Sequence, residues 1–329
     1  MSARVNRTLR FLGLALGVAL VGWLVARANA AALFGVFPRI GWGFALILAA
    51  RGATVIVDCA AWYCLLPRAE RPPFAVLLPL RWIGESINTT LPAAQIGGDV
   101  VRARLLQQRI ALPARGAASV AVDFCLSLFA QILFTLLGFV ILARLGDAWG
   151  WWPVAISVAL SAALVPAFAI LSWEILVRRR LLAAAERGAA RLGQHRLAAA
   201  LGALGIALGL VATSRAALAL SLSFHLASFI GHAAELWLTL YLMGISTGFA
   251  EATLLESLSL AMRSAAFLIP SGWGAQEASL IALATLTGLS AESALAVGLV
   301  KRAREFAIGL PGLAAWAIAE HRRPLRPPA

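Results

Sequence analysis

The chain has 329 residues, of which 61% are hydrophobic and 13% are charged, and its mean hydropathy is +0.86. Soluble domains are roughly 45–50% apolar and about 25% charged, so this composition excludes an ordinary soluble protein and predicts an integral membrane protein. Most of the residues behind the net charge of +13 cluster at the ends of apolar segments. We attribute that charge to topology and to anionic lipid headgroups, and not to nucleic-acid binding.

Six segments are apolar over the roughly 20 residues that a membrane-spanning helix requires. In chain order they are residues 9–28, 41–66, 117–143, 152–177, 216–243 and 291–319. We interpret the first as a retained span and not as a cleaved signal peptide, because it has no convincing small-residue cleavage site. The arginine-rich residues 178–196 and the short apolar residues 197–212 predict two interfacial helices on the cytoplasmic face.

Two further apolar segments, residues 74–108 and 249–290, contain Pro92 and Pro270 near their middle. A proline removes a backbone donor and ends a helix, so each segment predicts a helix, a break and a second helix. Arginines flank the first segment on both sides, and the positive-inside rule then places both of its ends in the cytoplasm. We therefore predict an all-α polytopic membrane protein with about six spans, two re-entrant broken-helix hairpins entering from opposite faces, and cytoplasmic N- and C-termini.

The two breaks belong to a weak internal repeat with an offset of 178 residues, in which an acidic residue follows each proline by seven positions. The same offset maps the second span onto the fifth and the third onto the sixth. Inverted repeats with broken helices near the midplane are typical of transporters, and a chance match is the alternative. We treat residues 1–329 as one membrane domain, with halves at about residues 1–143 and 152–320.

The acidic residues of the repeat are Asp99 and Glu277, and each stands where a half-helix begins after a break. Two interpretations are open. Each residue is a helix N-terminal carboxylate that accepts free N–H groups, or it is a site of ion or proton coupling. The residues that form the breaks are Pro92, Gly97, Gly98, Pro270, Gly272 and Gly274, and the glycines serve either close packing or ligand contact.

A charge at bilayer depth costs at least about 2.5–3.5 kcal/mol on insertion scales, so it usually faces a cavity or a partner. The candidates for binding an anionic headgroup are Arg81, Asn88, Gln95, Arg102, Arg263, Lys301 and Arg304. Arg263 and Arg304 are the strongest, because positive charge left beside half-helix N-termini suits a phosphate. The alternatives are a helix-face pair between Arg81 and Glu85, snorkelling of Arg102 to the interface, and capping of open backbone by Asn88 and Gln95.

The remaining polar residues inside spans predict pairing and packing. We expect Asp58 and Asp123 to pair with Arg51 or Lys301, and Glu305 to neutralise one of the cations on the last span. His225, His232 and Glu235 share one span and are explained better by polar packing than by zinc, which needs a further ligand and an open geometry. The sequence shows no catalytic triad order, no nucleotide loop and no metal spacing, so it predicts neither catalytic residues nor a cofactor.

Two motifs carry a resemblance to a known family. INTTLPAAQIGGDVVRARLL begins at Ile87, and IPSGWGAQEA begins at Ile269 and is followed by KRAREF. The chain resembles the lysylphosphatidylglycerol synthase transmembrane-domain, or flippase-like, family, and most closely its hopanoid-biosynthesis-associated membrane proteins. The resemblance implies a lipid translocase of the bacterial inner membrane, or an accessory to lipid or polyprenyl-sugar traffic. Lysyl-transferring members carry an additional soluble domain that this chain lacks, so it does not imply aminoacyl transfer.

The sequence thus favours a translocase for an amphipathic lipid whose anionic headgroup sits between the two hairpins. A lipid-modifying enzyme that uses Asp99 or Glu277 with a metal is the second hypothesis. The third is a non-transporting scaffold that meets lipid-biosynthesis enzymes through residues 178–196.

Overall fold

The computed structural model describes residues 36–68, 71–91, 97–110, 112–145, 180–212, 214–265, 275–284 and 287–321. Every regular element within these ranges is a helix, so the predicted all-α fold is confirmed. The first and fourth predicted spans lie outside the described residues. Three helical segments are long and apolar enough to cross a membrane, namely Gly43–Leu65, Ala114–Arg144 and Arg215–Leu242.

Four long helices correspond to the second, third, fifth and sixth predicted spans. They are α4 (Gly43–Leu65), α7 (Pro113–Leu145), α11 (Arg215–Leu242) and α14 (Ala291–His321). Helix α14 is not among the three apolar segments, because charged side chains interrupt its middle. Those charges are buried among other helices, which allows a helix of low hydropathy to lie inside the molecule.

Both predicted hairpins form as pairs of helices. The first consists of α5 (Phe74–Thr90) and α6 (Gly97–Gln107), and the second of α12 (Phe249–Ala265) and α13 (Ala275–Ala284). The breaks, residues 92–96 and 266–274, lie outside the described residues, and with them Pro92, Gln95, Pro270, Gly272 and Gly274. The remaining helices are α3 (Val36–Ile40), α9 (Arg180–Arg191) and α10 (His195–Ala212).

Local sequence explains where several helices begin and end. Helix α7 begins with Pro113, whose fixed φ and missing N–H are tolerated in a first turn. Ser214 caps α11 by accepting a hydrogen bond from the N–H of Ala217 at 3.3 Å. Gly244 lies just beyond the other end of α11 with φ +77°, a left-handed conformation that suits glycine at a helix terminus.

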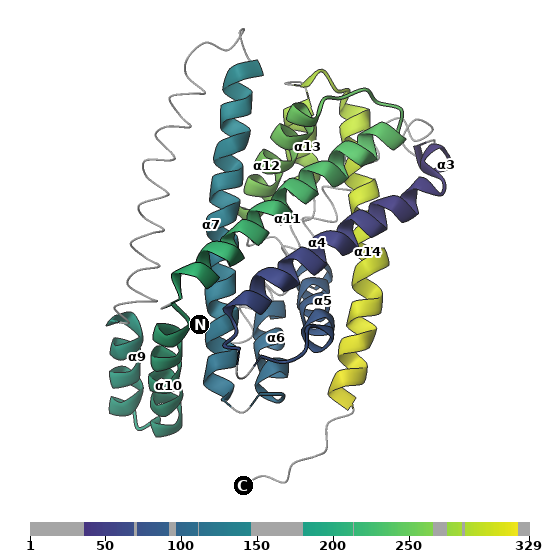
Figure 1. Ribbon diagram of the computed structural model, residues 1–329. Coiled ribbons are helices and arrows are strands. Elements are labelled where there is room, and N and C mark those ends of the chain that lie inside the picture. Colours follow the sequence, from purple (N-terminus) through teal and green to yellow (C-terminus); the bar gives the residue numbers. More distant parts are fainter. Residues whose placement is uncertain are drawn as a thin grey trace.

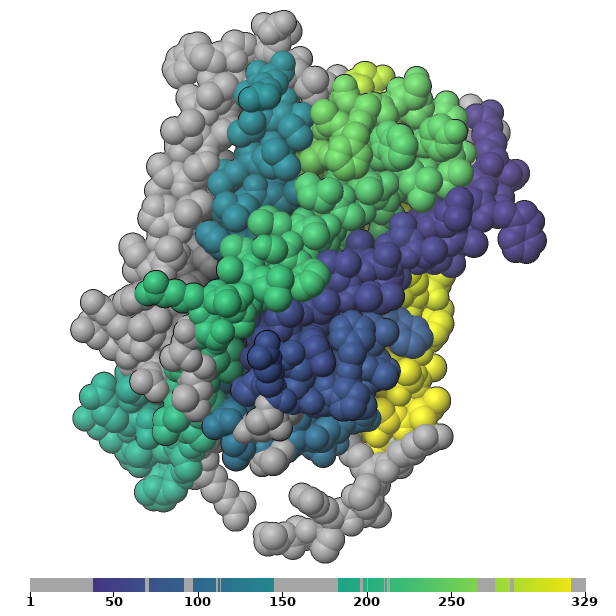
Figure 2. Space-filling model, in the orientation of Figure 1, coloured from purple at the N-terminus to yellow at the C-terminus, as the bar shows by residue number. Residues whose placement is uncertain are grey.

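Helices α4 and α11 cross the molecule diagonally, side by side, and α7 and α14 stand at its two sides (Figure 1). Helices α5 and α6 lie toward one end of the molecule and α12 and α13 toward the opposite end. The space-filling view shows α4 and α11 as adjacent bands across one face (Figure 2). The two hairpins therefore approach the middle from opposite ends.

The second half repeats the helix order of the first. Helices α6 and α13 begin at Gly97 and Ala275, and α7 and α14 begin at Pro113 and Ala291, a difference of 178 residues in both cases. The contacts repeat as well, because α5 packs on α14 of the other half while α12 packs on α7. The offset observed in the sequence is thus also the offset between equivalent helices.

Apolar cores fill both ends of the molecule. One is built by α4, α5, α6 and the far end of α14, with Trp62 and Leu106 fully buried. The other is built by the beginning of α4, the end of α11 and helices α12, α13 and α14, with Leu280 and Val300 at its centre. The polar residues of the spans lie between these two cores.

Candidate functional site

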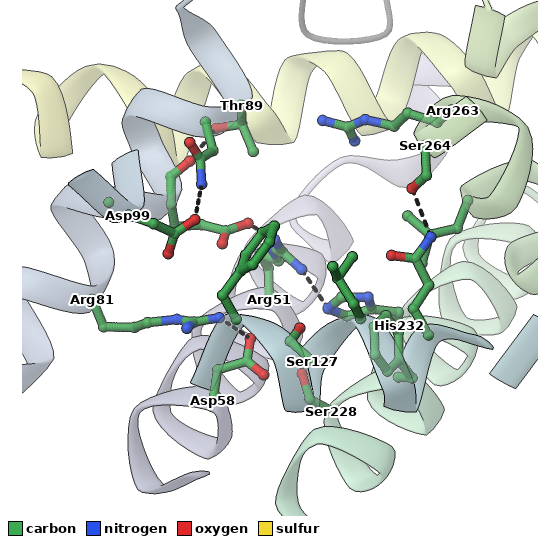
Figure 3. Close-up of a pocket in the computed structure, with 18 of the residues that line it drawn as sticks. Arg51, Asp58, Arg81, Thr89, Asp99, Ser127, Ser228, His232, Arg263 and Ser264 are labelled. Carbon is green, nitrogen blue, oxygen red and sulfur yellow. Dashed lines mark hydrogen bonds and ion pairs between the residues drawn. The ribbon is translucent and has the colours of Figure 1, made fainter. Parts of the chain in front are cut away.

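A cavity of about 340 Å³ lies between the two halves, lined by α4, α5, α6 and α7 from the first and by α11, α12, α13 and α14 from the second. Figure 3 shows polar side chains from both halves around it. Six of the lining side chains are cationic: Arg51, Arg81, Arg102, Arg263, Lys301 and Arg304. Five are carboxylates: Asp58, Glu85, Asp99, Asp123 and Glu256.

Asp123 of α7 is the centre of a buried ion-pair network on the first-half side. Its side chain has no solvent exposure and accepts from Arg81 at 3.0 Å and from Arg102 at 2.8 Å. His225 of α11 lies 3.0 Å from its other oxygen. We call Asp58, Arg81, Asp99, Arg102, Asp123 and His225 the Asp123 cluster. It ties α4, α5, α6, α7 and α11 together at the depth of the cavity.

The beginning of α6 is held by a side chain of α5. Asn88 accepts from the N–H of Gly98 at 2.7 Å and donates to the carboxylate of Asp99 at 3.1 Å. Asp99 also pairs with Arg102 at 2.8 Å. Asn88 thus does satisfy backbone at the break, as one of the sequence interpretations held, and Asp99 is fixed by two partners in the first turn of a half-helix.

Arg51 links the two central helices to the first hairpin. Its guanidinium pairs with Glu85 of α5 and donates to Nε2 of His232 on α11 at 2.6 Å (Figure 3). The Nε2 atom of His232 is therefore an acceptor and its imidazole is neutral, because a protonated nitrogen has no lone pair to offer an arginine.

A second network fills the second-half side. Arg302 donates to both oxygens of Glu277 at 2.6 and 3.3 Å and to Glu305 at 2.6 Å. Arg263 reaches Glu305 at 3.0 Å, and Arg304 pairs with Glu235. We call Glu235, Arg263, Glu277, Arg302, Arg304 and Glu305 the Glu305 cluster. Lys301 pairs separately with Glu256 of α12.

The predicted surplus of positive charge on the last span is wrong. The Glu305 cluster contains three arginines and three glutamates, and Lys301 has Glu256 as its own partner. The cavity itself is lined by six cations and five carboxylates, an excess of one, because Glu235 and Glu305 stand behind its wall. A cation paired from behind still presents part of its charge to the cavity.

Three predicted pairings are also wrong. Arg81 does not pair with its helix neighbour Glu85, but with Asp58 at 3.3 Å and with Asp123. Neither aspartate pairs with Arg51 or Lys301 as expected. Arg102 does not snorkel, since its side chain is 1% exposed and lies over the ring of Trp62 at 4.5 Å. These side chains turn inward because a carboxylate inside the bundle neutralises them better than the distant interface can.

The structure brings most of the predicted site residues to one cavity. The lining includes Arg81, Asn88, Asp99, Arg102, Arg263, Lys301 and Arg304. Glu277 is not among the lining residues, because it is buried behind them against Arg302. Gly97 and Gly98 begin α6, and Gly98 meets the carbonyl oxygen of Gly84 so closely that a side chain has no room.

Sequence reasoning missed Glu85, His232 and Glu256 as members of the site. Each is a titratable residue inside an apolar helix, which is the one signal that pointed to them. Their partners lie 34, 181 and 45 residues away in the chain, so helical spacing does not reveal the pairs. Among the described residues, no group of three His, Cys, Asp or Glu is arranged to hold a metal ion.

The comparisons with known proteins agree with the architecture. A family model described as the lysylphosphatidylglycerol synthase TM region matches residues 10–312. Comparisons with curated proteins and with solved structures gave no match. Because the matched region spans most of the 329 residues, the chain belongs to the family of lysylphosphatidylglycerol synthase transmembrane regions.

Proposed function

We propose that the protein is a lipid translocase, a flippase or scramblase that binds an anionic headgroup in the cavity and leaves the lipid tails in the membrane. The observation that carries this proposal is the polar cavity between two structurally equivalent halves. Ligand pockets usually measure about 300–1,000 Å³, so 340 Å³ suits a headgroup and is too small for a whole lipid.

The charge of the lining supports an anionic headgroup. Arg263 and Arg304 present guanidinium groups to the cavity while their carboxylate partners stand behind them. Lys301 lines the same wall. A phosphate oxygen accepts several charge-assisted hydrogen bonds at once, and this wall offers several donors within one cavity.

Apolar side chains support an exit for the tails. Phe124, Leu128, Phe229 and Leu260 line the cavity beside the charged groups. Leu128 is 36% exposed on α7, a helix apolar enough to face lipid. An amphipathic ligand finds both of its chemistries here, polar groups at depth and an apolar margin.

The proposed mechanism follows from the equivalence of the halves. The helix order, the 178-residue offset and the exchanged contacts of α5 and α12 support an inverted repeat. Rocking of one half against the other would open the cavity to each face in turn. In this mechanism the ion pairs at the cavity exchange partners with the headgroup and re-form after its release.

The orientation is proposed from the positions of exposed arginines. Arg68, Arg104, Arg109, Arg187 and Arg191 are exposed and belong to segments at the end of the molecule where α6 and α9 lie (Figure 1). The positive-inside rule makes this the cytoplasmic end, in a bacterial inner membrane. A link to hopanoid or polyprenyl-lipid metabolism, and to its enzymes as partners, stays a prediction from the resemblance.

The test is transfer of a fluorescent anionic phospholipid between leaflets of vesicles that contain the purified protein. Arg263→Gln removes one cavity donor, while Glu305 keeps Arg302 at 2.6 Å, so the fold should survive. We expect a loss of transfer rate of about tenfold or more, which corresponds to about 1.4 kcal/mol. Arg104→Gln is the matched control, because Arg104 pairs with Glu320 at the exposed surface.

Equal transfer rates for wild type, Arg263→Gln and protein-free vesicles would overturn the translocase proposal. A lipid product formed by the purified protein and abolished by a metal chelator would favour the enzyme. Lipid mass spectrometry on purified wild type and on Arg263→Gln identifies the headgroup, since a species retained only by wild type belongs to the cavity.

A further inference from the structure

The buried charges of the described residues fall into groups joined by direct contacts, and nearly all of these groups are neutral. The Glu305 cluster has three arginines and three glutamates, and Lys301 with Glu256 balances one against one. Arg51 with Glu85 also balances, because His232 is neutral when it accepts from Arg51. Neutral groups are what a low-dielectric interior demands.

The Asp123 cluster is the exception. It has three carboxylates, Asp58, Asp99 and Asp123, against two guanidiniums, Arg81 and Arg102. One positive charge is missing as long as the sixth member, His225, is counted as neutral. Asp123 and His225 are completely buried, so solvent does not supply the missing charge.

The geometry of His225 supplies it. Its Nε2 lies 3.0 Å from one oxygen of Asp123, and its Nδ1 lies 3.4 Å from one oxygen of Asp58. A neutral imidazole has one N–H donor and one bare lone pair, so one of its nitrogens would face a carboxylate oxygen with lone pair against lone pair. Only the doubly protonated ring donates toward both carboxylates.

We propose that His225 is a proton-binding site, and that its imidazolium closes the charge balance of the Asp123 cluster and joins α11 to α4 and α7. The charged groups around it come from every packed side: Asp58 on α4, Asp123 on α7, and Arg81 and Arg102 reaching these carboxylates from α5 and α6. Toward α12 and α14, Glu256 and Lys301 satisfy each other. Loss of the proton leaves an uncompensated carboxylate where three helices meet.

The direct test is nitrogen NMR of the protein labelled at histidine, in lipid nanodiscs at about pH 8, above the ordinary histidine pKa of about 6.5. The His225 signals, assigned by their loss in His225→Gln, are expected to show two protonated ring nitrogens. His232 is expected to show one bare nitrogen, and the exposed His195 serves as the neutral reference. A bare nitrogen in His225 would overturn the proposal.

Thermal stability provides a second test with opposite outcomes for the two protonation states. If His225 is charged, His225→Gln unbalances the cluster, and adding Asp58→Asn leaves two carboxylates against two guanidiniums and recovers stability. If His225 is neutral, the single variant keeps the charge and the double variant is the less stable. The proposal therefore requires the double variant to melt at the higher temperature.

The inference does not rest on the translocase proposal. Absence of lipid transfer in vesicles, with two protonated nitrogens in His225, would end the proposed function and leave the proton site standing. The reverse pair of results would do the opposite.

Discussion

At the scale of single residues, burial decides how much an ion pair contributes to folding. Asp123 is completely buried and faces Arg81, Arg102 and His225, whereas the Asp99 side chain is 18% exposed and its partner Arg102 keeps a second carboxylate. Removing one partner from a buried network leaves the others without compensation, but the same change at the cavity surface admits water.

We therefore predict that Asp123→Asn lowers the free energy of unfolding by about 3–5 kcal/mol, the usual loss for a broken buried pair. Asp99→Asn should cause a clearly smaller loss. The measurement is the melting temperature of both purified variants in the same detergent, beside wild type. Equal melting temperatures for the two variants would show that the Asp123 cluster is not the structural centre that its contacts indicate.

Residue identity in the site was largely predictable and residue pairing was not. Arg263, Lys301 and Arg304 were expected to face a cavity because a charge inside an apolar helix has few other places to go, and they line one. Their partners come from other helices, as Glu235 does for Arg304 at a separation of 69 residues. Sequence spacing gives the face of a helix, but it does not give the helix that meets that face.

At the scale of helices, glycines set how closely the hairpin packs. A side chain at Gly98 would fall on the carbonyl oxygen of Gly84, so α5 and α6 can approach as they do only without it. Gly52 on α4 has nothing within 4 Å of the position that a side chain would take. The two glycines therefore form a matched pair, one at a tight helix crossing and one in open space.

Gly98→Ala should destabilise the protein by about 1–3 kcal/mol or more, the range for overpacking of a close contact. Gly52→Ala should leave stability unchanged or raise it by about 0.5–1 kcal/mol, because alanine restricts the unfolded chain and favours a helix. Melting temperatures of the two variants check this. A Gly98→Ala variant as stable as Gly52→Ala would mean that the hairpin has room to shift.

The hairpins themselves followed from the sequence, and their depth did not. Proline inside an apolar segment gave both breaks, and the helices end on either side of them, at Thr90 and Gly97 in the first hairpin. Hydropathy alone would have rejected α14 as a span. Its charges are tolerated because α11, α12 and α13 bring carboxylates to it, a fact of tertiary structure.

At the scale of the whole molecule, the halves are joined by two equivalent crossings, α5 on α14 and α12 on α7. Both crossings place a glycine of a long helix against a hydroxyl residue of a hairpin. Gly309 meets Thr90 in the first, and Gly138 meets Ser257 in the second. Small residues allow two helices to slide or tilt against each other, so these crossings are where rocking of the halves would be absorbed.

A disulfide across a crossing should therefore stop the proposed transport. A side chain at position 309 would place its Cβ 3.7 Å from the Cβ of Thr90, within the 3.5–4.5 Å that disulfides span. In protein whose three native cysteines are replaced by alanine, we expect Gly309→Cys with Thr90→Cys to lose lipid transfer on oxidation and to regain it with dithiothreitol. Each single substitution under the same oxidant is the control. Transfer at the full rate by the oxidised pair, with the crosslink confirmed by mass spectrometry, would show that α5 and α14 move as one body and would rule out rocking at this crossing.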